Sequence, residues 1–160
     1  MLDQLKELLE MQRVLDESIF NAKGITEYPL DNMKVALFVE LGELMNEFPT
    51  KFKHWKSSAV DNREKGLVEY VDCLHFALSL TNYYGTDIVG YELDYNHPYN
   101  KYLLNGHFTL SQMLDCVNYE TTPLNDIFEL GNYFGFTWDE IYSAYKKKNA
   151  VNYERLRNNY

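Results

Sequence analysis

The stretch Val35-Ala-Leu-Phe-Val-Glu-Leu-Gly-Glu-Leu-Met45 combines a helical apolar pattern with two carboxylates three residues apart, Glu40 and Glu43. Residues at this spacing lie on one face of a helix, so both carboxylates can reach a single ion. We therefore predict a helix from Asp31 to about Phe48 that carries a pair of acids among apolar side chains. Pro49 ends it.

A second stretch repeats this combination: Glu69-Tyr-Val-Asp72-Cys-Leu-His75-Phe76-Ala-Leu-Ser79. It lies in a predicted helix from about Glu64 to Tyr83, in which the acids border the apolar face. If the two helices pack together, the four carboxylates form the oxygen-only ligand set that Mg²⁺ or Mn²⁺ prefers. Such a metal site would suit phosphate chemistry.

Spacing alone is a weak signal, because three other acidic pairs share it and are explained by solvated helix faces: Glu7/Glu10, Asp61/Glu64 and Asp126/Glu129. The two pairs above differ because they lie in mid-helix among large apolar residues. Two carboxylates about 5 Å apart repel by roughly 1 kcal/mol in water and by about 3 kcal/mol in a partly buried site. Carboxylates on the rim of two amphipathic helices remain the alternative. A di-iron bundle usually has Glu-x-x-His, and Asp72 occupies the His position.

The remaining sequence predicts further helices. From Leu2 to Ile19 an apolar stripe of helical period is interrupted by Gln12 and Asp16, which should face the interior or a pocket wall and need partners there. Three helix starts follow from capping signals at Thr109, Thr122-Pro123 and Thr137, the last leading from Trp138 into the 150s. We expect an all-α bundle of about five to six helices in one domain, 1–160, with a variable, insert-like region at 84–122.

Composition limits the classes of partner. The 46% hydrophobic and 16% aromatic content indicates large packed surfaces, some of them shared between subunits. A formal charge of -9 argues against nucleic-acid or anionic-membrane binding. Cys73 and Cys116 fit neither a disulfide framework nor a zinc spacing, and no apolar run is long enough to cross a bilayer. A cytoplasmic location is expected.

The order of the motifs, Glu-x-x-Glu, then Trp-Lys, then Glu-x-x-Asp followed by His-Phe, resembles the all-α nucleoside triphosphate pyrophosphohydrolases. The resemblance is greatest to the dimeric dUTPases found in phages, bacteria and trypanosomatids. The opening Leu8-Leu-Glu-Met-Gln12-Arg-Val-Leu-Asp16 is similar to the first motif of that family, in which a Gln and a nearby Asn or Asp help to form the uracil pocket. This similarity would account for the polar residues in the first apolar stripe.

The resemblance implies that Mg²⁺, with Mn²⁺ as a substitute, is bound by Glu40, Glu43, Glu69 and Asp72. It also implies that Trp55 and Phe76 wall the nucleoside pocket, that His75 lies near the deoxyribose, and that Lys56 contacts phosphate. Without this resemblance, Trp55, Phe76 and His75 would be interpreted as core residues and Lys56 as a solvated surface charge.

The last motif, Lys148-Asn-Ala-Val-Asn152-Tyr-Glu-Arg155-Leu-Arg-Asn-Asn-Tyr160, is similar to the family's Lys-Asn-x-x-Asn-x-x-Arg ending in Tyr. Lys148 and Arg155 are two helical turns apart on one face and can place cationic donors against a polyphosphate. Asn152 lies between them and could pair with a base edge. A basic, solvated C-terminal helix is the alternative.

The expected function is the hydrolysis of dUTP to dUMP and pyrophosphate, with Glu43 as the general base and Glu40 as the alternative. Uracil would be selected by Gln12, Asp16 and Asn152. Two rivals stay open: a related pyrophosphohydrolase that prefers dCTP or accepts many NTPs, and a non-catalytic helical interaction protein. The expected partners are the nucleotide and a second copy of the chain, with no nucleic acid and no membrane.

Overall fold

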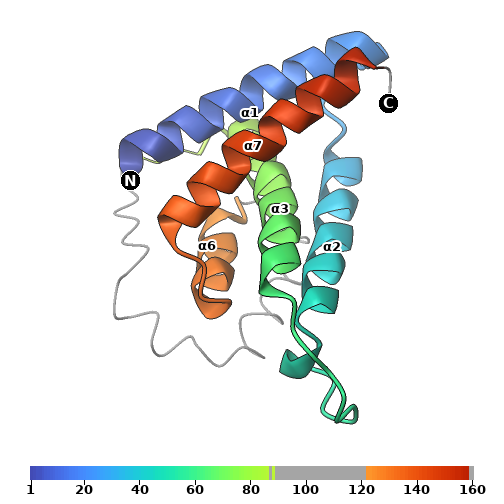
Figure 1. Cartoon of the computed structure of the whole chain (residues 1–160). Helices are drawn as coiled ribbons and strands as arrows, with labels where there is room; N and C mark the ends of the chain where they lie inside the picture. Colours follow the sequence, from blue (N-terminus) through green and yellow to red (C-terminus); the bar gives the residue numbers. More distant parts are fainter. Residues whose placement is uncertain (87, 89–121, 159–160) are drawn as a thin grey trace.

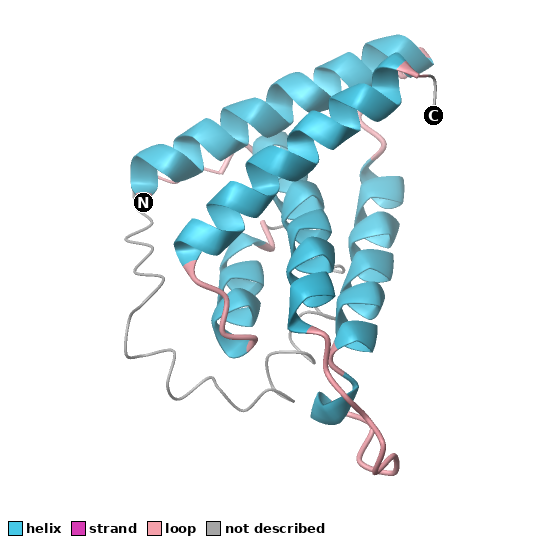
Figure 2. Ribbon diagram, in the orientation of Figure 1, coloured by secondary structure: helices cyan, strands magenta, loops and turns pink. Residues whose placement is uncertain are grey.

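The computed structural model describes residues 1–86, 88 and 122–158. Within these ranges the chain forms five α-helices and one 3-10 turn, joined by loops and without a strand, which confirms the all-α class (Figure 2). The elements are α1 Leu2–Lys23, α2 Leu30–Glu47, η1 Pro49–Lys51, α3 Arg63–Tyr84, α6 Leu124–Tyr133 and α7 Trp138–Arg157.

Helix α3 is the centre of the bundle and contacts α1, α2, α6 and α7. In Figure 1, α2 and α3 run antiparallel and side by side, while α1 and α7 lie next to each other across the end of this pair. The buried residues of α3 cover most of its surface, including the phenol of Tyr70, which donates a hydrogen bond of 2.9 Å to the carbonyl oxygen of Ile127 on α6. The four helices around α3 thus share one core.

The helix boundaries follow local signals. Gly24 takes a left-handed conformation (φ 67°) and ends α1 at Lys23, four residues beyond Ile19, the last residue of the apolar stripe. Thr137 and Glu140 form the predicted capping box at the start of α7. At the start of α6 the amide of Leu124 donates to the Thr122 hydroxyl. The predicted helix start at Thr109 and most of the insert-like region lie outside the described residues.

Cys73 is buried and forms no disulfide, whereas Cys116 lies outside the described residues. No helix in the described part of the chain combines the length and the apolar character that a membrane span requires.

Gly66 marks the closest approach between α3 and the end of α2. A Cβ atom at this position would lie 2.2 Å from Cε2 of Phe48, whose ring is stacked on Phe134 at 4.1 Å and has little room to move. We expect Gly66→Ala to destabilise the protein by about 1–3 kcal/mol, even though alanine is the better helix former. Gly42→Ala is the matched control, because a Cβ there meets nothing within 4 Å and should stabilise α2 by up to about 1 kcal/mol. Urea unfolding of both variants measures the difference, and equal shifts would contradict the close packing.

Candidate active site

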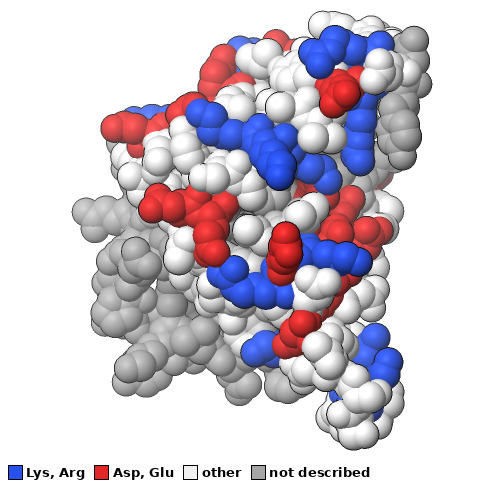
Figure 3. Space-filling view, in the orientation of Figure 1, with Lys and Arg blue, Asp and Glu red and all other residues white. Residues whose placement is uncertain are grey.

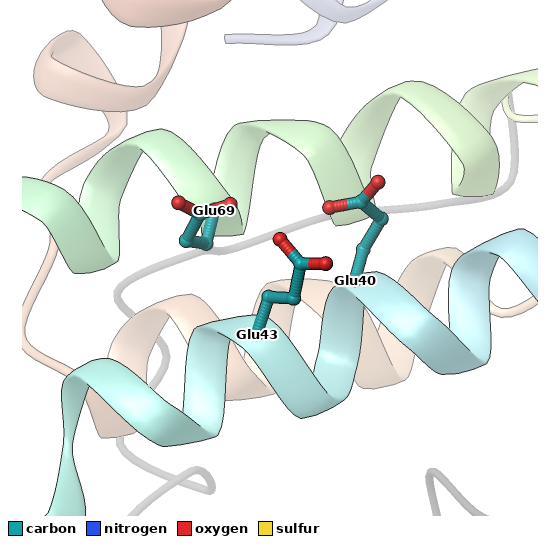
Figure 4. A group of neighbouring side chains, drawn as sticks. All are labelled: Glu40, Glu43 and Glu69. Atoms are coloured by element: carbon teal, nitrogen blue, oxygen red, sulfur yellow. The ribbon is translucent and has the colours of Figure 1, made fainter.

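Three carboxylates converge where α2 and α3 lie side by side. Glu40 and Glu43 project from α2 and Glu69 projects from α3, and each offers an oxygen that lies within 4.8 Å of the oxygens of the other two (Figure 4). Glu43 is exposed, whereas Glu40 and Glu69 are half-buried. Three of the four predicted metal ligands therefore lie close together in the structure.

The cluster holds more negative charge than its surroundings favour. Burial, followed by the charges of Asp72, Glu43 and Glu69, raises the pKa of Glu40 to about 7. Burial and the charges of Asp72 and Glu43 also raise the pKa of Glu69. A carboxyl group with a raised pKa among like charges is a site that a cation would stabilise. The donor set, three carboxylates without nitrogen or sulfur, matches hard cations such as Mg²⁺.

Asp72, the fourth predicted ligand, is held by a lysine from α7. The Nζ atom of Lys148 donates to Oδ2 of Asp72 at 2.5 Å, and the two side chains are only 18% and 16% exposed. Asp72 nevertheless lies close enough to Glu40 and Glu69 to raise the pKa of both. The ammonium group of Lys148 thus supplies positive charge at the edge of the acidic cluster.

A buried polar network joins α1, α3 and α7 on the side of α3 that faces α1. Gln12 is its centre: Nε2 donates to Asp16 at 2.7 Å, while Oε1 lies 2.7 Å from both the Tyr145 hydroxyl and Nδ1 of His75. The network continues from the Asp16 carboxyl to the hydroxyl of Ser79. Burial raises the pKa of Asp16, and the hydrogen bond with Ser79 partly offsets this rise. The Ser79 hydroxyl is in turn hydrogen-bonded to the hydroxyl of Tyr28 on the α1–α2 loop. The two polar residues of the first stripe therefore do face the interior and do have partners.

Two side chains of this region keep buried polar atoms without a partner among the described residues: His75 at Nε2 and Asn149 at Nδ2. The His75 ring stacks on Tyr145 with 4.1 Å between centroids, and Asn149 lies beside the Tyr145 hydroxyl. Tyr145 and Asn149 were not assigned a role from the sequence. A signal was present, because both lie on the buried stripe Trp138, Ile141, Tyr145, Asn149 of α7, where a polar residue is as unusual as Gln12 is on α1.

Burial makes His75 a neutral side chain with a pKa lowered to about 3 from an ordinary value of 6.5. Between these values the unfolded chain binds more protons than the folded one, so the stability contributed by the neutral ring is lost as the pH falls below about 6.5, at up to about 1.4 kcal/mol per pH unit. We expect the free energy of unfolding to fall more between pH 7 and pH 5 in the wild type than in His75→Asn. Urea unfolding at both pH values tests this, since the other titrating groups cancel in the comparison, and parallel pH slopes would contradict it.

The remaining predicted substrate residues are spread more widely. Phe76 is half-buried on α3, Asn152 is half-buried on α7, and Arg155 is exposed near the end of α7, whereas Tyr160 lies outside the described residues. Figure 3 shows basic side chains over α7 on the face that it displays. Of the predicted contacts to phosphate and base, Asn152 and Arg155 thus lie on the same helix as Lys148.

Trp55 and Lys56 lie apart from the other predicted residues. The loop that joins α2 to α3 extends beyond the ends of both helices in Figure 1, and its base is closed by Asp61, which accepts from the amide and the hydroxyl of Thr50. Trp55 is 68% exposed, and Lys56 is exposed as well. The rings next to Trp55 are those of Phe52 and His54. The structure does not bring this indole to His75 or Phe76.

A family described as dUTPase matches residues 4–160, which is nearly the whole chain. No curated protein matches the chain. Because the match spans both acidic pairs, the polar network and the motif that begins at Lys148, it covers every part of the site described above. The chain therefore belongs to the all-α dUTPase family, whose members are nucleotide pyrophosphohydrolases.

Proposed function

We propose that the protein hydrolyses dUTP to dUMP and pyrophosphate in a reaction that depends on Mg²⁺, for which Mn²⁺ can substitute. The observation that carries this proposal is the convergence of Glu40, Glu43 and Glu69 within 4.8 Å in a protein of the dUTPase family. Their oxygen-only chemistry and the raised pKa of Glu40 support a divalent cation at this place.

In the proposed site Glu40, Glu43 and Glu69 would hold the ion, with Asp72 as the fourth ligand next to them. A bound Mg²⁺ ion would neutralise charge on the triphosphate and lower the pKa of an attacking water. Glu43 is the proposed general base because it is exposed and can meet that water; Glu40 is the alternative, since its pKa of about 7 would let it exchange a proton near neutral pH.

The chain's own cations and polar groups would position the nucleotide. Lys148 and Arg155 are proposed to bind the phosphates from α7, and Lys56 and Tyr160 to contribute where their segments reach the substrate. His75 would lie near the deoxyribose, with Phe76 and Trp55 as walls of the pocket. Gln12, Asp16 and Asn152 are proposed to surround the uracil.

The test is a nucleotide panel assayed with purified protein. We expect turnover of dUTP to dUMP and pyrophosphate with Mg²⁺, loss of turnover in EDTA, and its return with Mg²⁺ or Mn²⁺. Turnover of dCTP or of many NTPs at the same rate as dUTP would contradict the assignment of dUTP as the preferred substrate. Absence of turnover for every nucleotide would favour a helical interaction protein that retains the fold.

We also propose a homodimer. Support comes from three apolar residues of α2 that remain exposed, Val35, Phe38 and Val39, where a soluble helix would normally carry polar groups. We expect Phe38→Glu to shift the mass measured by light scattering from two chains toward one, while Val60→Glu, an equally apolar-to-acidic change on the α2–α3 loop, leaves the mass unchanged. A single chain in the wild type would contradict the proposal.

The cytoplasmic location, the single domain and the absence of nucleic-acid partners stay predictions.

A further inference from the structure

Asp72 is the predicted metal ligand that does not belong to the converging group. An oxygen of each of the three glutamates, Glu40, Glu43 and Glu69, lies within 4.8 Å of those of the other two. Asp72 instead accepts at Oδ2 from Nζ of Lys148 at 2.5 Å. After burial, the charge of Asp72 is the strongest cause of the raised pKa of Glu40 and of Glu69. Asp72 therefore lies beside the cluster, with its carboxylate already bound to a cation of the protein.

The ammonium group of Lys148 partly neutralises the whole cluster. Burial and the neighbouring acids raise the pKa of Glu40 and Glu69, and the charge of Lys148 partly offsets this rise at both residues. A divalent cation among the same oxygens would neutralise them more fully. Because a cation bound to Asp72 would repel an ammonium group on the same carboxylate, the lysine and the metal ion compete for Asp72.

Few contacts hold the lysine at Asp72. An ammonium group has three donors, yet among the described residues Nζ of Lys148 has a single hydrogen-bonded partner. The side chain of Lys148 also lines a groove of about 330 Å³ between α3 and α7, whose walls include Val68, Val71 and Val151. This groove gives a flexible four-carbon stem room to move without repacking the core. Lys148 can therefore leave Asp72 by rotation of its side chain alone.

A phosphate group would offer the ammonium a second partner. Lys148 lies two helical turns before Arg155 on α7, and both are proposed to bind the phosphates of the nucleotide. The donors of Lys148 that Asp72 does not use suit phosphate oxygens, with which they would form charge-assisted hydrogen bonds. A lysine drawn to phosphate would release the carboxylate of Asp72, which could then join Glu40 and Glu69 as a ligand.

We propose that Lys148 is a positioning residue that covers Asp72 in the metal-free protein and uncovers it by moving to a phosphate group of the nucleotide. Asp72 then completes the ligand set, so the nucleotide and the metal ion strengthen each other's binding through this one side chain. The inference rests on the proposed function and deepens it, because it gives Lys148 control of the metal site in addition to its contact with phosphate.

Binding of Mn²⁺ without nucleotide, followed by the EPR signal of the free ion, tests the cover. Lys148→Met leaves Asp72 uncovered, so we expect it to bind Mn²⁺ at least roughly tenfold more tightly than the wild type. Lys147→Met is the matched control, because this exposed neighbour carries the same charge and lines the same groove, and its loss should change the affinity much less. In Lys148→Met with Asp72→Asn the gain should disappear. No gain in Lys148→Met, an equal gain in Lys147→Met, or a gain that survives the loss of Asp72 would overturn the inference.

The coupling is measured by the same titrations in the presence of dUMP, which carries a phosphate group and cannot release pyrophosphate. After correction for Mn²⁺ bound by dUMP alone, dUMP should tighten Mn²⁺ binding to the wild type at least roughly fivefold. The effect should be much smaller in Lys148→Met, in which Asp72 is uncovered from the start. An absent effect in the wild type, or effects of equal size in the two proteins, would overturn the inference.

Nitrogen NMR of the wild type follows the lysine itself and does not depend on how well Lys148→Met folds. The Nζ signal of Lys148 is assigned by its shift in Asp72→Asn, and Mg²⁺ with dUMP should move it away from its ligand-free position. A signal that stays in place at saturation would show that Lys148 remains on Asp72 and would overturn the inference. If the wild type does not hydrolyse dUTP, the proposed function fails first; if it does and dUMP leaves the Mn²⁺ affinity unchanged, only the inference fails.

Discussion

Glu69→Gln is expected to lower kcat/KM for dUTP by at least roughly a thousandfold while it stabilises the metal-free protein. The activity falls because one of three converging oxygen donors is replaced by an amide that carries no charge. The stability rises because burial and the charges of Asp72 and Glu43 disfavour the ionised form of Glu69, as its raised pKa indicates. Opposite signs of the two effects are the signature of a cation site in a protein from which the cation has been removed.

Steady-state turnover with Mg²⁺ and thermal unfolding with EDTA measure the two effects. Glu129→Gln is the control, since Glu129 also belongs to an acidic pair of the same spacing, is partly buried, and has a pKa raised by burial and by Asp126, but lies on α6 outside the cluster. It should leave turnover close to that of the wild type, because Glu129 does not belong to the acidic cluster. We further expect Mg²⁺ to raise the unfolding temperature of the wild type and not of Glu69→Gln. Turnover of Glu69→Gln close to that of the control would refute the metal site.

The fold could be predicted because its signals are local. An apolar period of about 3.6 residues marks the helices that became α1, α2 and α3, and the Thr137-x-x-Glu140 box marks the start of α7. The apolar stripe of α1 stops at Ile19, before the helix does. The end of the helix is marked by Gly24, whose left-handed conformation terminates it.

The site could be predicted only in part, because hydrogen bonds between distant segments decide it. The meeting of Glu40 and Glu43 with Glu69 requires only that two helices pack side by side, which their apolar faces predict. The bond from Lys148 to Asp72 joins residues 76 positions apart, and no spacing in the sequence indicates it. The same holds for Tyr145, which meets Gln12 across 133 positions.

Residues that are close to one another in the sequence do not always lie in the same site. Trp55 follows the first acidic pair closely, and the motif order alone groups them, yet its indole is exposed on the α2–α3 loop. Conversely, Asn149 was part of the recognised C-terminal motif but had no assigned role, and its unpartnered Nδ2 became visible only with the packing of α7 against α3. A motif indicates which residues matter, whereas hydrogen-bond geometry indicates what each can do.

Lys148→Met is expected to destabilise the metal-free protein by roughly 3 kcal/mol, because removing one partner of a largely buried ion pair leaves the other charge uncompensated. The charge left behind is that of Asp72, which lies beside Glu40 and Glu69 and already raises the pKa of both. Lys146→Met is the matched control. Lys146 lies on the same helix and forms an ion pair with Glu7 at 2.8 Å, but both of these side chains are nearly half exposed, at 46% and 44%. Its cost should be much smaller than that of Lys148→Met, because solvent screens an exposed ion pair.

The cause of the Lys148→Met effect can be separated from lost packing by a second substitution. In Lys148→Met with Asp72→Asn the uncompensated charge is gone, so most of the lost stability should return, and the coupling energy from the double-mutant cycle should be large. Mg²⁺ should stabilise Lys148→Met more than the wild type, since a cation in the acidic cluster replaces the missing ammonium charge. Urea unfolding with EDTA and with Mg²⁺ measures all four proteins. Equal losses in Lys148→Met and Lys146→Met, or no recovery in the double variant, would show that the lysine does not compensate the charge of the acidic cluster.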